Sequence, residues 1–222
     1  MSTYAFMKIL ESAPNRYDKG INMLSFGKLD KAYDRLISPI KEGQQVLDIG
    51  CGTGALTIKS AQRHAKVVGI DINPQMLDIA RKHVQELQLT ENIQLVEAGV
   101  AEMESMEAES YDVVMSGLCF SELSEDEQAY ALKQVNRVLK EGGLLLLADE
   151  TVAKNFFLKA INLPVKITVK FITYILTQTG TRAVRHLPEK VKQAGFQIES
   201  VRYNKMQDFI ELTAVKHKAP KS

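Results

Sequence analysis

Short apolar runs alternate with amphipathic stretches between residues 45 and 148, and this alternation constrains the fold more than any other feature. The stretches between the runs predict helices, one of which begins with Asn73 as its N-cap and Pro74 at the first helical position. Alternation of strands and helices favours a parallel sheet covered on both faces. The predicted strands are 45–49, 66–70, 93–97, 111–115 and 143–148, and the predicted helices are 55–64, 74–87 and 124–139.

Both ends of the chain depart from this alternation. Residues 1–40 are mixed in character, with one stretch typical of a helix at 29–37. Residues 151–186 are apolar and basic, and we expect a helical cap over a substrate pocket, bent or broken at Pro164; a surface for a partner protein or a membrane is the alternative. Since no linker interrupts the sequence, we expect residues 1–222 to form one domain with these two additions. One further helix and two closing strands are predicted at 187–194, 196–203 and 208–215.

Composition excludes several classes of function. With 28 basic and 27 acidic side chains there is no net charge to attract a polyanion, so we expect no nucleic-acid partner. The two cysteines, Cys51 and Cys119, are far apart in sequence and are expected to be free thiols in a reducing compartment. Cysteine and histidine show no metal-ligand spacing. The sequence carries no signal-peptide pattern and no uninterrupted apolar stretch of membrane-spanning length, so a cytoplasmic location is expected.

The most informative motif is a strand, then a glycine at every second position (Gly50, Gly52, Gly54), then a helix. Glycines allow the turn a positive φ and allow a ligand to approach the backbone closely. The free N–H groups at the start of the helix suit a negatively charged or strongly accepting group. The alternative is a tight turn that binds nothing.

An acidic residue, Asp71, closes the second predicted strand. In a doubly wound sheet this position lies beside the first glycine turn, in the crevice where ligands bind. A carboxylate there can accept hydrogen bonds from both hydroxyls of a ribose; the alternative is that it only starts the next helix. The glycine spacing differs from the G-x-G-x-x-G of dinucleotide sites. Asp48 would also repel a pyrophosphate, and it suits a ligand with a cationic amino group.

Residues 46–57 resemble the first motif of the class I S-adenosylmethionine (SAM)-dependent methyltransferases, and Asp71 matches the acid that holds the ribose of SAM in that family. Residues 110–118 resemble the family's fourth-strand motif, and residues 138–144 resemble its turn into the fifth strand. The resemblance covers roughly residues 45–149. It implies a Rossmann-like, doubly wound α/β fold with a seven-stranded, mostly parallel sheet, and an enzyme that converts SAM to S-adenosylhomocysteine.

The same resemblance implies a set of cofactor-binding residues. Gly50 and Gly52 would lie against the amino-acid portion of SAM, with Asp48 near its amine. Many relatives have an aspartate after the third strand that pairs with the adenine amine; this chain has Val100 there, which implies backbone and apolar contacts instead. Ile72 and Met76 would flank the adenine, and Ser116 and Gly117 would border the methionyl end. The remaining members of the expected set are Tyr17, Cys51, Thr53, Gly54, Asp71 and Ala101.

Two narrower resemblances concern the methyl acceptor. Residues 16–27 are similar to the N-terminal segment of the ubiquinone/menaquinone C-methyltransferases, which implies that Tyr17 closes over SAM; a packed surface aromatic is the alternative. The whole chain, including residues 177–187, more closely resembles small methyltransferases associated with corrinoid proteins. A small-molecule or corrinoid-related acceptor is therefore expected, with a corrinoid protein as candidate partner. The alternatives are a quinone-biosynthesis C-methyltransferase and a non-catalytic SAM-binding accessory protein of a corrinoid system.

Methyl transfer from a sulfonium is an in-line displacement, so the protein mainly aligns the acceptor and excludes water. A general base is needed only if the acceptor must lose a proton. Asp149, at the end of the fifth predicted strand, and His186, before the next helix, are the candidates. A capping or solvated acid and a structural histidine are the alternatives. Arg182 and Arg185 could hold an anionic substrate or could simply be solvated.

Overall fold

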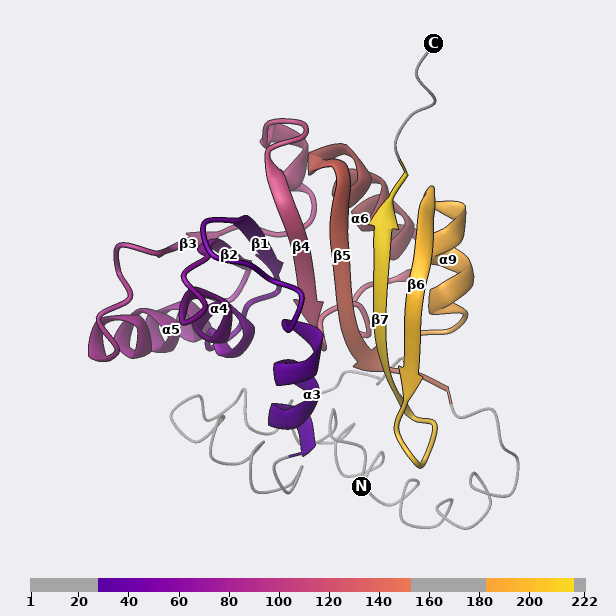
Figure 1. Cartoon of the computed structure of the whole chain (residues 1–222), viewed down its shortest axis with the longest axis horizontal. Coiled ribbons are helices and arrows are strands. Elements are labelled where there is room, and N and C mark those ends of the chain that lie inside the picture. Colours follow the sequence, from indigo (N-terminus) through magenta and orange to yellow (C-terminus); the bar gives the residue numbers. More distant parts are fainter. Residues whose placement is uncertain (1–27, 153–182, 218–222) are drawn as a thin grey trace.

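The computed structural model describes residues 28–152 and 183–217, which form a seven-stranded sheet with helices packed against it (Figure 1). The strand order is β3-β2-β1-β4-β5-β7-β6, and β7 pairs antiparallel with both of its neighbours while the other pairs are parallel. The prediction of a mostly parallel, doubly wound α/β sheet is therefore confirmed. The strands are β1 Gln45–Ile49, β2 Lys66–Asp71, β3 Ile93–Glu97, β4 Tyr111–Gly117, β5 Leu139–Glu150, β6 Phe196–Tyr203 and β7 Phe209–Lys216.

The helices follow the predicted pattern, with one early ending. The side chain of Asn73 caps the helix that follows it, accepting from the backbone N–H groups of Gln75 and Met76, as predicted. The helix predicted to reach residue 64 ends at Ala61, because His64 adopts a positive φ of 62° and the chain turns into β2. The described helices are α3 Lys28–Leu36, α4 Ala55–Ala61, α5 Pro74–Glu86, the 3-10 turn η2 Glu102–Ser105, α6 Glu125–Val138 and α9 Leu187–Gln193.

Two strands extend beyond their predicted bounds by two residues or more. β4 continues to Gly117 instead of ending at residue 115, and β5 begins at Leu139 instead of residue 143. Leu139 was predicted to end the preceding helix, but it pairs with Tyr111 just before a register shift in the β4–β5 ladder. Its side chain is fully buried, so tertiary packing decides its conformation.

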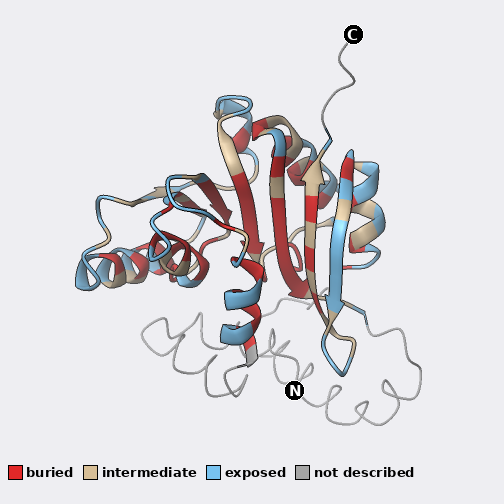
Figure 2. Cartoon of the chain, in the orientation of Figure 1, coloured by how far each residue is buried: buried red, intermediate tan, exposed pale blue. Residues whose placement is uncertain are grey.

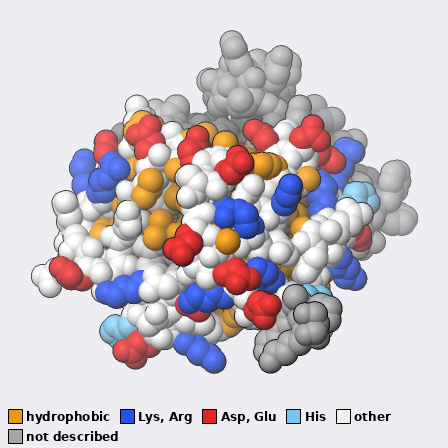
Figure 3. Space-filling view, turned by 90° about the horizontal axis from the view of Figure 1, so that it is seen from above, with side chains coloured by type: hydrophobic (Ala, Val, Ile, Leu, Met, Phe, Trp, Pro, Cys, Tyr) orange, Lys and Arg blue, Asp and Glu red, His pale blue; other side chains and the backbone are white. Residues whose placement is uncertain are grey.

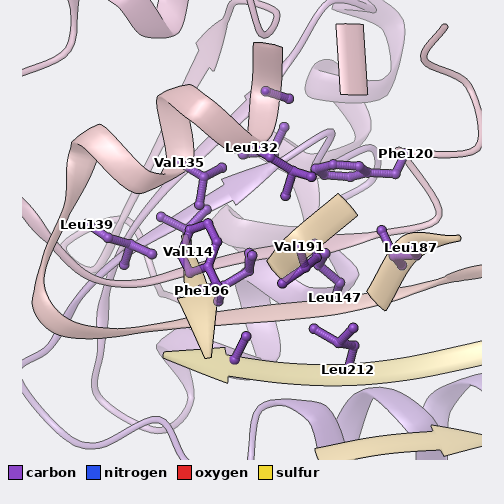
Figure 4. Packing of buried hydrophobic residues seen from close by; sticks show 14 of the residues in the cluster. Val114, Phe120, Leu132, Val135, Leu139, Leu147, Leu187, Val191, Phe196 and Leu212 are labelled. Carbon is purple, nitrogen blue, oxygen red and sulfur yellow. The ribbon is translucent and has the colours of Figure 1, made fainter. Parts of the chain in front are cut away.

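The core lies on both faces of the sheet. Val46 and Leu47 are neighbours in β1 and both are fully buried, yet they pack into different clusters, because successive side chains of a strand point to opposite faces. One cluster joins the sheet to α6 and α9 (Figure 4), and the other joins it to α3 and α4. Accordingly, the central strands β4 and β5 are buried along most of their length, whereas β6 at the edge is largely exposed (Figure 2).

Ion pairs attach helix α3 to the rest of the fold. Arg35 forms a bidentate salt bridge with Glu211 of β7, at 3.0 Å from Nε to Oε2 and 2.6 Å from Nη2 to Oε1. On the other side, Lys59 of α4 pairs with Asp30 at 2.9 Å and with Asp34 at 2.6 Å. These contacts fix α3 near the carboxyl ends of the parallel strands (Figure 1), where a ligand would bind in such a sheet.

Residues 183 and 184 return beside the end of β5. The backbone N–H of Val184 donates to the carbonyl of Glu150 at 2.9 Å, and Thr151 Oγ1 donates to the carbonyl of Val184 at 3.0 Å. The helical character predicted for the whole of 151–186 is therefore wrong at these positions, where the backbone groups pair with the end of β5 instead. Residues 1–27 and 153–182 lie outside the described residues, so the expected cap and the single-domain assignment stay predictions.

Candidate functional site

A pocket of about 730 Å³ opens at the carboxyl ends of β1, β2 and β4, within the size range of small-molecule sites. The strand order reverses between β1 and β4, because β2 and β3 extend to one side of β1 and the later strands to the other. Such a reversal leaves a crevice in which open α/β sheets bind their ligands. Ten of the expected cofactor-binding residues line this pocket: Gly50, Cys51, Gly52, Thr53, Asp71, Ile72, Met76, Val100, Ala101 and Gly117.

The glycine turn has the backbone conformation that the motif predicts. Gly50, Gly52 and Gly54 have φ values of 68°, 54° and 88°, in the left-handed region that favours glycine. A Cβ atom added to Gly52 would meet nothing within 4 Å, so there is space beside it for a ligand. Gly54 does not line the pocket; it is the N-cap of α4 and has Ala80 and Ile58 beside it.

The structure brings Asp71 into direct contact with this turn. One carboxylate oxygen accepts from the backbone N–H of Gly52 at 2.8 Å, and the other accepts from that of Asn73 at 2.8 Å. Both bonds hold the carboxylate in the pocket lining, between β2 and the start of α5. A direct hydrogen bond therefore joins the end of the second strand to the glycine loop.

An apolar part of the pocket lies beyond Asp71. Ile72 is 75% exposed although it is a large hydrophobic residue, and its Cγ2 atom would lie 2.8 Å from a Cβ added to Gly99. Met76 is buried, and Val100 lines the same pocket. An exposed apolar side chain over a glycine gives a flat ring a surface to lie against. Glu102, which the sequence did not single out, accepts from the N–H of Gly99 at 2.7 Å and closes this part of the pocket.

Asp48 lies beneath the glycine turn and not in the pocket lining. It is 1% exposed; Oδ2 accepts from Thr57 Oγ1 at 2.6 Å, and Oδ1 has no hydrogen-bond partner among the described residues. Burial raises the pKa of this carboxyl to about 7, against the lowering effect of the Thr57 hydrogen bond. A buried carboxylate oxygen without a partner is costly, and a cationic or hydrogen-bond-donating ligand group would stabilise it.

Of the two residues at the end of β4 that were expected to bind the cofactor, only one lines the pocket. Ser116 is buried, does not line the pocket, and donates from Oγ to the carbonyl of Ile49 at 2.8 Å, which ties β4 to β1. Gly117 does line the pocket, where a Cβ would lie 2.7 Å from the hydroxyl oxygen of Tyr33 and 2.8 Å from Leu56 Cδ1. The next residue, Leu118, has a φ of 63°, which is strained for a leucine and occurs here at the pocket.

The structure brings neither candidate base into the pocket lining. Asp149 is 2% exposed, and its carboxylate accepts from the backbone N–H groups of Glu150 at 2.7 Å and Ser121 at 3.2 Å. Burial raises its pKa to about 7. His186 is exposed and is the N-cap residue of α9, away from the pocket. Arg185 is exposed and also outside the pocket, while Tyr17 and Arg182 lie outside the described residues.

The charges that line the pocket are mostly negative, because five acidic residues lie in its wall: Asp30, Asp71, Glu102, Glu122 and Glu127. Lys59 also lines it but is paired with Asp30 and Asp34. Such a lining favours a cationic or neutral ligand and disfavours an anionic one. The face seen in Figure 3 differs, since basic and acidic side chains are interspersed there.

Within residues 28–152 and 183–217, no group of His, Cys, Asp and Glu side chains has the arrangement of a metal site. In the same part of the chain, no helix has the length and apolar character needed to span a bilayer.

Burial of the carboxyls of Asp48 and Asp149 predicts a pH dependence of stability. Their pKa values of about 7 in the folded protein exceed the ordinary 3.8, so the folded state binds these protons more tightly than the unfolded state. Their contribution to the free energy of unfolding is therefore largest below about pH 4 and is lost as the pH rises through about 7. We expect urea denaturation to show that Asp149→Asn weakens this fall between about pH 4 and about pH 7. A variant whose stability follows the wild-type pH profile in parallel would contradict the prediction.

Residues 46–143 match a family model described as a methyltransferase domain. The ubiquinone/menaquinone biosynthesis C-methyltransferase of Escherichia fergusonii is 32% identical over 146 residues, which are 64% of this chain and 57% of that protein. The demethylmenaquinone methyltransferase of Staphylococcus aureus is 30% identical over 147 residues, which are 64% of this chain and 58% of that protein. The matched region thus spans a little over half the length of these relatives.

Solved structures share the fold. A SAM-dependent methyltransferase from Aquifex aeolicus superposes with a TM-score of 0.62 at 19% identity, covering 84% of this chain and 88% of that one. An O-methyltransferase family protein from Burkholderia thailandensis gives a TM-score of 0.71 at 18% identity, covering 97% of this chain and 64% of that one. At these identities the likeness shows the architecture alone.

Proposed function

We propose, from the match of residues 46–143 to a methyltransferase domain, that this chain binds SAM and transfers its methyl group to a small-molecule acceptor. The observation that carries the proposal is the contact of Asp71 with the glycine turn, in a pocket that has free space beside Gly52. A dinucleotide is a poor fit, because the acidic lining and the buried Asp48 would repel a pyrophosphate.

The pocket-lining residues match the chemical parts of SAM. Asp71 lines the pocket and would accept hydrogen bonds from the ribose hydroxyls, and Ile72 and Val100 would offer the adenine apolar contacts. The unpartnered Oδ1 of Asp48 fits the cationic amino group from below the turn, and the backbone of Gly50 fits the amino-acid portion. When bound, SAM supplies an electrophilic methyl group on its sulfonium. The residues of the chain then hold the acceptor in line with that methyl group and exclude water.

The acceptor side of the pocket supports a neutral, partly apolar acceptor. We assign the acceptor to the part of the pocket lined by Leu29, Leu118 and Leu123, and the acidic residues of the lining disfavour an anionic acceptor there. A hydroquinone ring has the required character, and two relatives are named for methylation in quinone biosynthesis. We therefore favour a quinol-type C-methyl acceptor over the corrinoid-related acceptor expected from the sequence, since the relatives give no support to a corrinoid protein partner. The apolar side and the neutral ring would pack together without a buried unpaired charge.

Calorimetry and label transfer test this function in sequence. Titration of the purified chain with SAM, S-adenosylhomocysteine and NAD⁺ is expected to show binding of the first two and none of the third. Incubation with methyl-labelled SAM and a 2-alkyl-1,4-naphthoquinol is then expected to yield labelled naphthoquinol. Binding without transfer to any acceptor would instead favour a non-catalytic SAM-binding protein, and absence of binding to both SAM and its product would refute the proposal.

A further inference from the structure

Tyr33 is the one tyrosine that helix α3 places in the pocket wall, within residues 28–36. Its side chain is 7% exposed and packs in the same cluster as Leu36, Ile37 and Leu56. The ion pairs from Arg35 to Glu211 and from Lys59 to Asp30 hold the helix on both sides of this tyrosine. The position of its hydroxyl group is therefore set by a fixed helix.

The hydroxyl lies at the end of β4. A Cβ atom at Gly117 would stand 2.7 Å from the hydroxyl oxygen, so that the tyrosine side chain would have to move to admit it. The φ of Gly117 is not in the left-handed region, so what requires glycine here is space. Under the proposed function, Gly117 borders the methionyl end of SAM, so the tyrosine hydroxyl lies at the end of the cofactor from which the methyl group leaves.

The surroundings keep this hydroxyl protonated. Burial raises the pKa of Tyr33 far above its usual value, and the negative charges of Asp48 and Asp149 raise it further. The group is therefore a hydrogen-bond donor and cannot serve as a base near neutral pH. Tyr33 lines the pocket, so its hydroxyl proton can be offered to a ligand there.

We propose that the Tyr33 hydroxyl donates a hydrogen bond to a neutral oxygen of the methyl acceptor and thereby holds the acceptor against the methyl group. This inference rests on the proposed function and narrows it, because it requires an acceptor with a carbonyl or hydroxyl oxygen close to the methylated atom. The oxygen is neutral, because an anionic one would face the buried carboxyls of Asp48 and Asp149 as well as the acidic pocket lining.

A carbonyl probe tests the hydrogen bond without knowledge of the natural acceptor. The protein is saturated with S-adenosylhomocysteine and titrated with 1-tetralone, whose oxygen only accepts hydrogen bonds, and with tetralin, which lacks the oxygen. Wild type is expected to bind tetralone more tightly by about fivefold to tenfold, and Tyr33→Phe to lose that preference. Tyr111→Phe is the matched control, because Tyr111 is a half-buried tyrosine at the opposite end of β4, and it should keep the preference.

The possible outcomes distinguish a failure of the role proposed for Tyr33 from a failure of the proposed function. Wild type that binds S-adenosylhomocysteine without preferring tetralone, or Tyr33→Phe that keeps the preference, would overturn the role of Tyr33 alone. Wild type that does not bind S-adenosylhomocysteine would overturn both. The wild-type comparison of the two probes does not depend on how well the variant folds. In turnover with a naphthoquinol, Tyr33→Phe should lower kcat/KM for the acceptor about tenfold and leave KM for SAM unchanged.

Discussion

Replacement of Asp71 by alanine is expected to lower the affinity for SAM by about 100-fold or more. The variant would lose the proposed acceptor for the ribose hydroxyls, and hydrogen bonds to a charged group contribute about 1.5–3 kcal/mol each. It also leaves the backbone N–H groups of Gly52 and Asn73 without their acceptor, so the glycine turn loses its attachment to β2. The loss of two hydrogen bonds of this strength, one from each ribose hydroxyl, corresponds to at least about two powers of ten in affinity. Isothermal titration with SAM and with S-adenosylhomocysteine measures the effect.

Glu97→Ala is the matched control for this loss. Glu97 ends β3 in register with Asp71, so it is an acid at the same edge of the sheet. It is exposed, however, and does not line the pocket. Its replacement should change the affinity for SAM by less than about twofold, since surface charges contribute little. Equal affinities of Asp71→Ala and wild type would mean that SAM does not bind beside Asp71.

Gly50→Ala is expected to destabilise the folded protein by about 2–5 kcal/mol. The φ of 68° costs an alanine about 1–2 kcal/mol. The added methyl group would also stand 2.5 Å from Cys119 Sγ and 2.6 Å from Cys119 Cβ, and overpacking of this kind costs about 1–3 kcal/mol more. Urea denaturation of the unliganded protein measures the sum.

Gly43→Ala separates the two contributions. Gly43 has a φ of 78°, but a Cβ there would meet nothing within 4 Å, and the residue does not line the pocket. Its replacement should therefore cost only the conformational part, about 1–2 kcal/mol. If Gly50→Ala and Gly43→Ala lower the free energy of unfolding equally, the added methyl group does not clash with Cys119. That result would contradict the close packing of Gly50 against the residues that follow β4.

The sequence predicted those parts of the fold and site that are encoded by neighbouring residues. The conformation of the glycine turn could be predicted locally, because glycine adopts the positive φ values seen there without the steric cost that other residues have. Asp71 could be placed because a doubly wound sheet puts the end of its second strand beside the first turn, and the structure shows the resulting contact with Gly52. The capping of α5 by Asn73 is local in the same way.

The sequence could not predict which side chains reach the pocket when their positions depend on packing between distant parts of the chain. Tyr33 is 84 residues from Gly117, and nothing in the amphipathic pattern of α3 marks it as a pocket residue before the helix is docked on the sheet. The acidic end of β5 suggested a base in the site, but Asp149 is turned inward and its carboxylate accepts two backbone N–H groups. Leu118 likewise lines the pocket with a positive φ that no local pattern predicts for leucine.

A crystal structure of the chain with S-adenosylhomocysteine would test most directly whether this crevice is built for SAM. We expect the ribose hydroxyls within hydrogen-bond distance of the Asp71 carboxylate, the adenine against Ile72, and the amino-acid arm over Gly50. A ligand bound elsewhere, or bound in the pocket with its ribose turned away from Asp71, would contradict the assignment of the site.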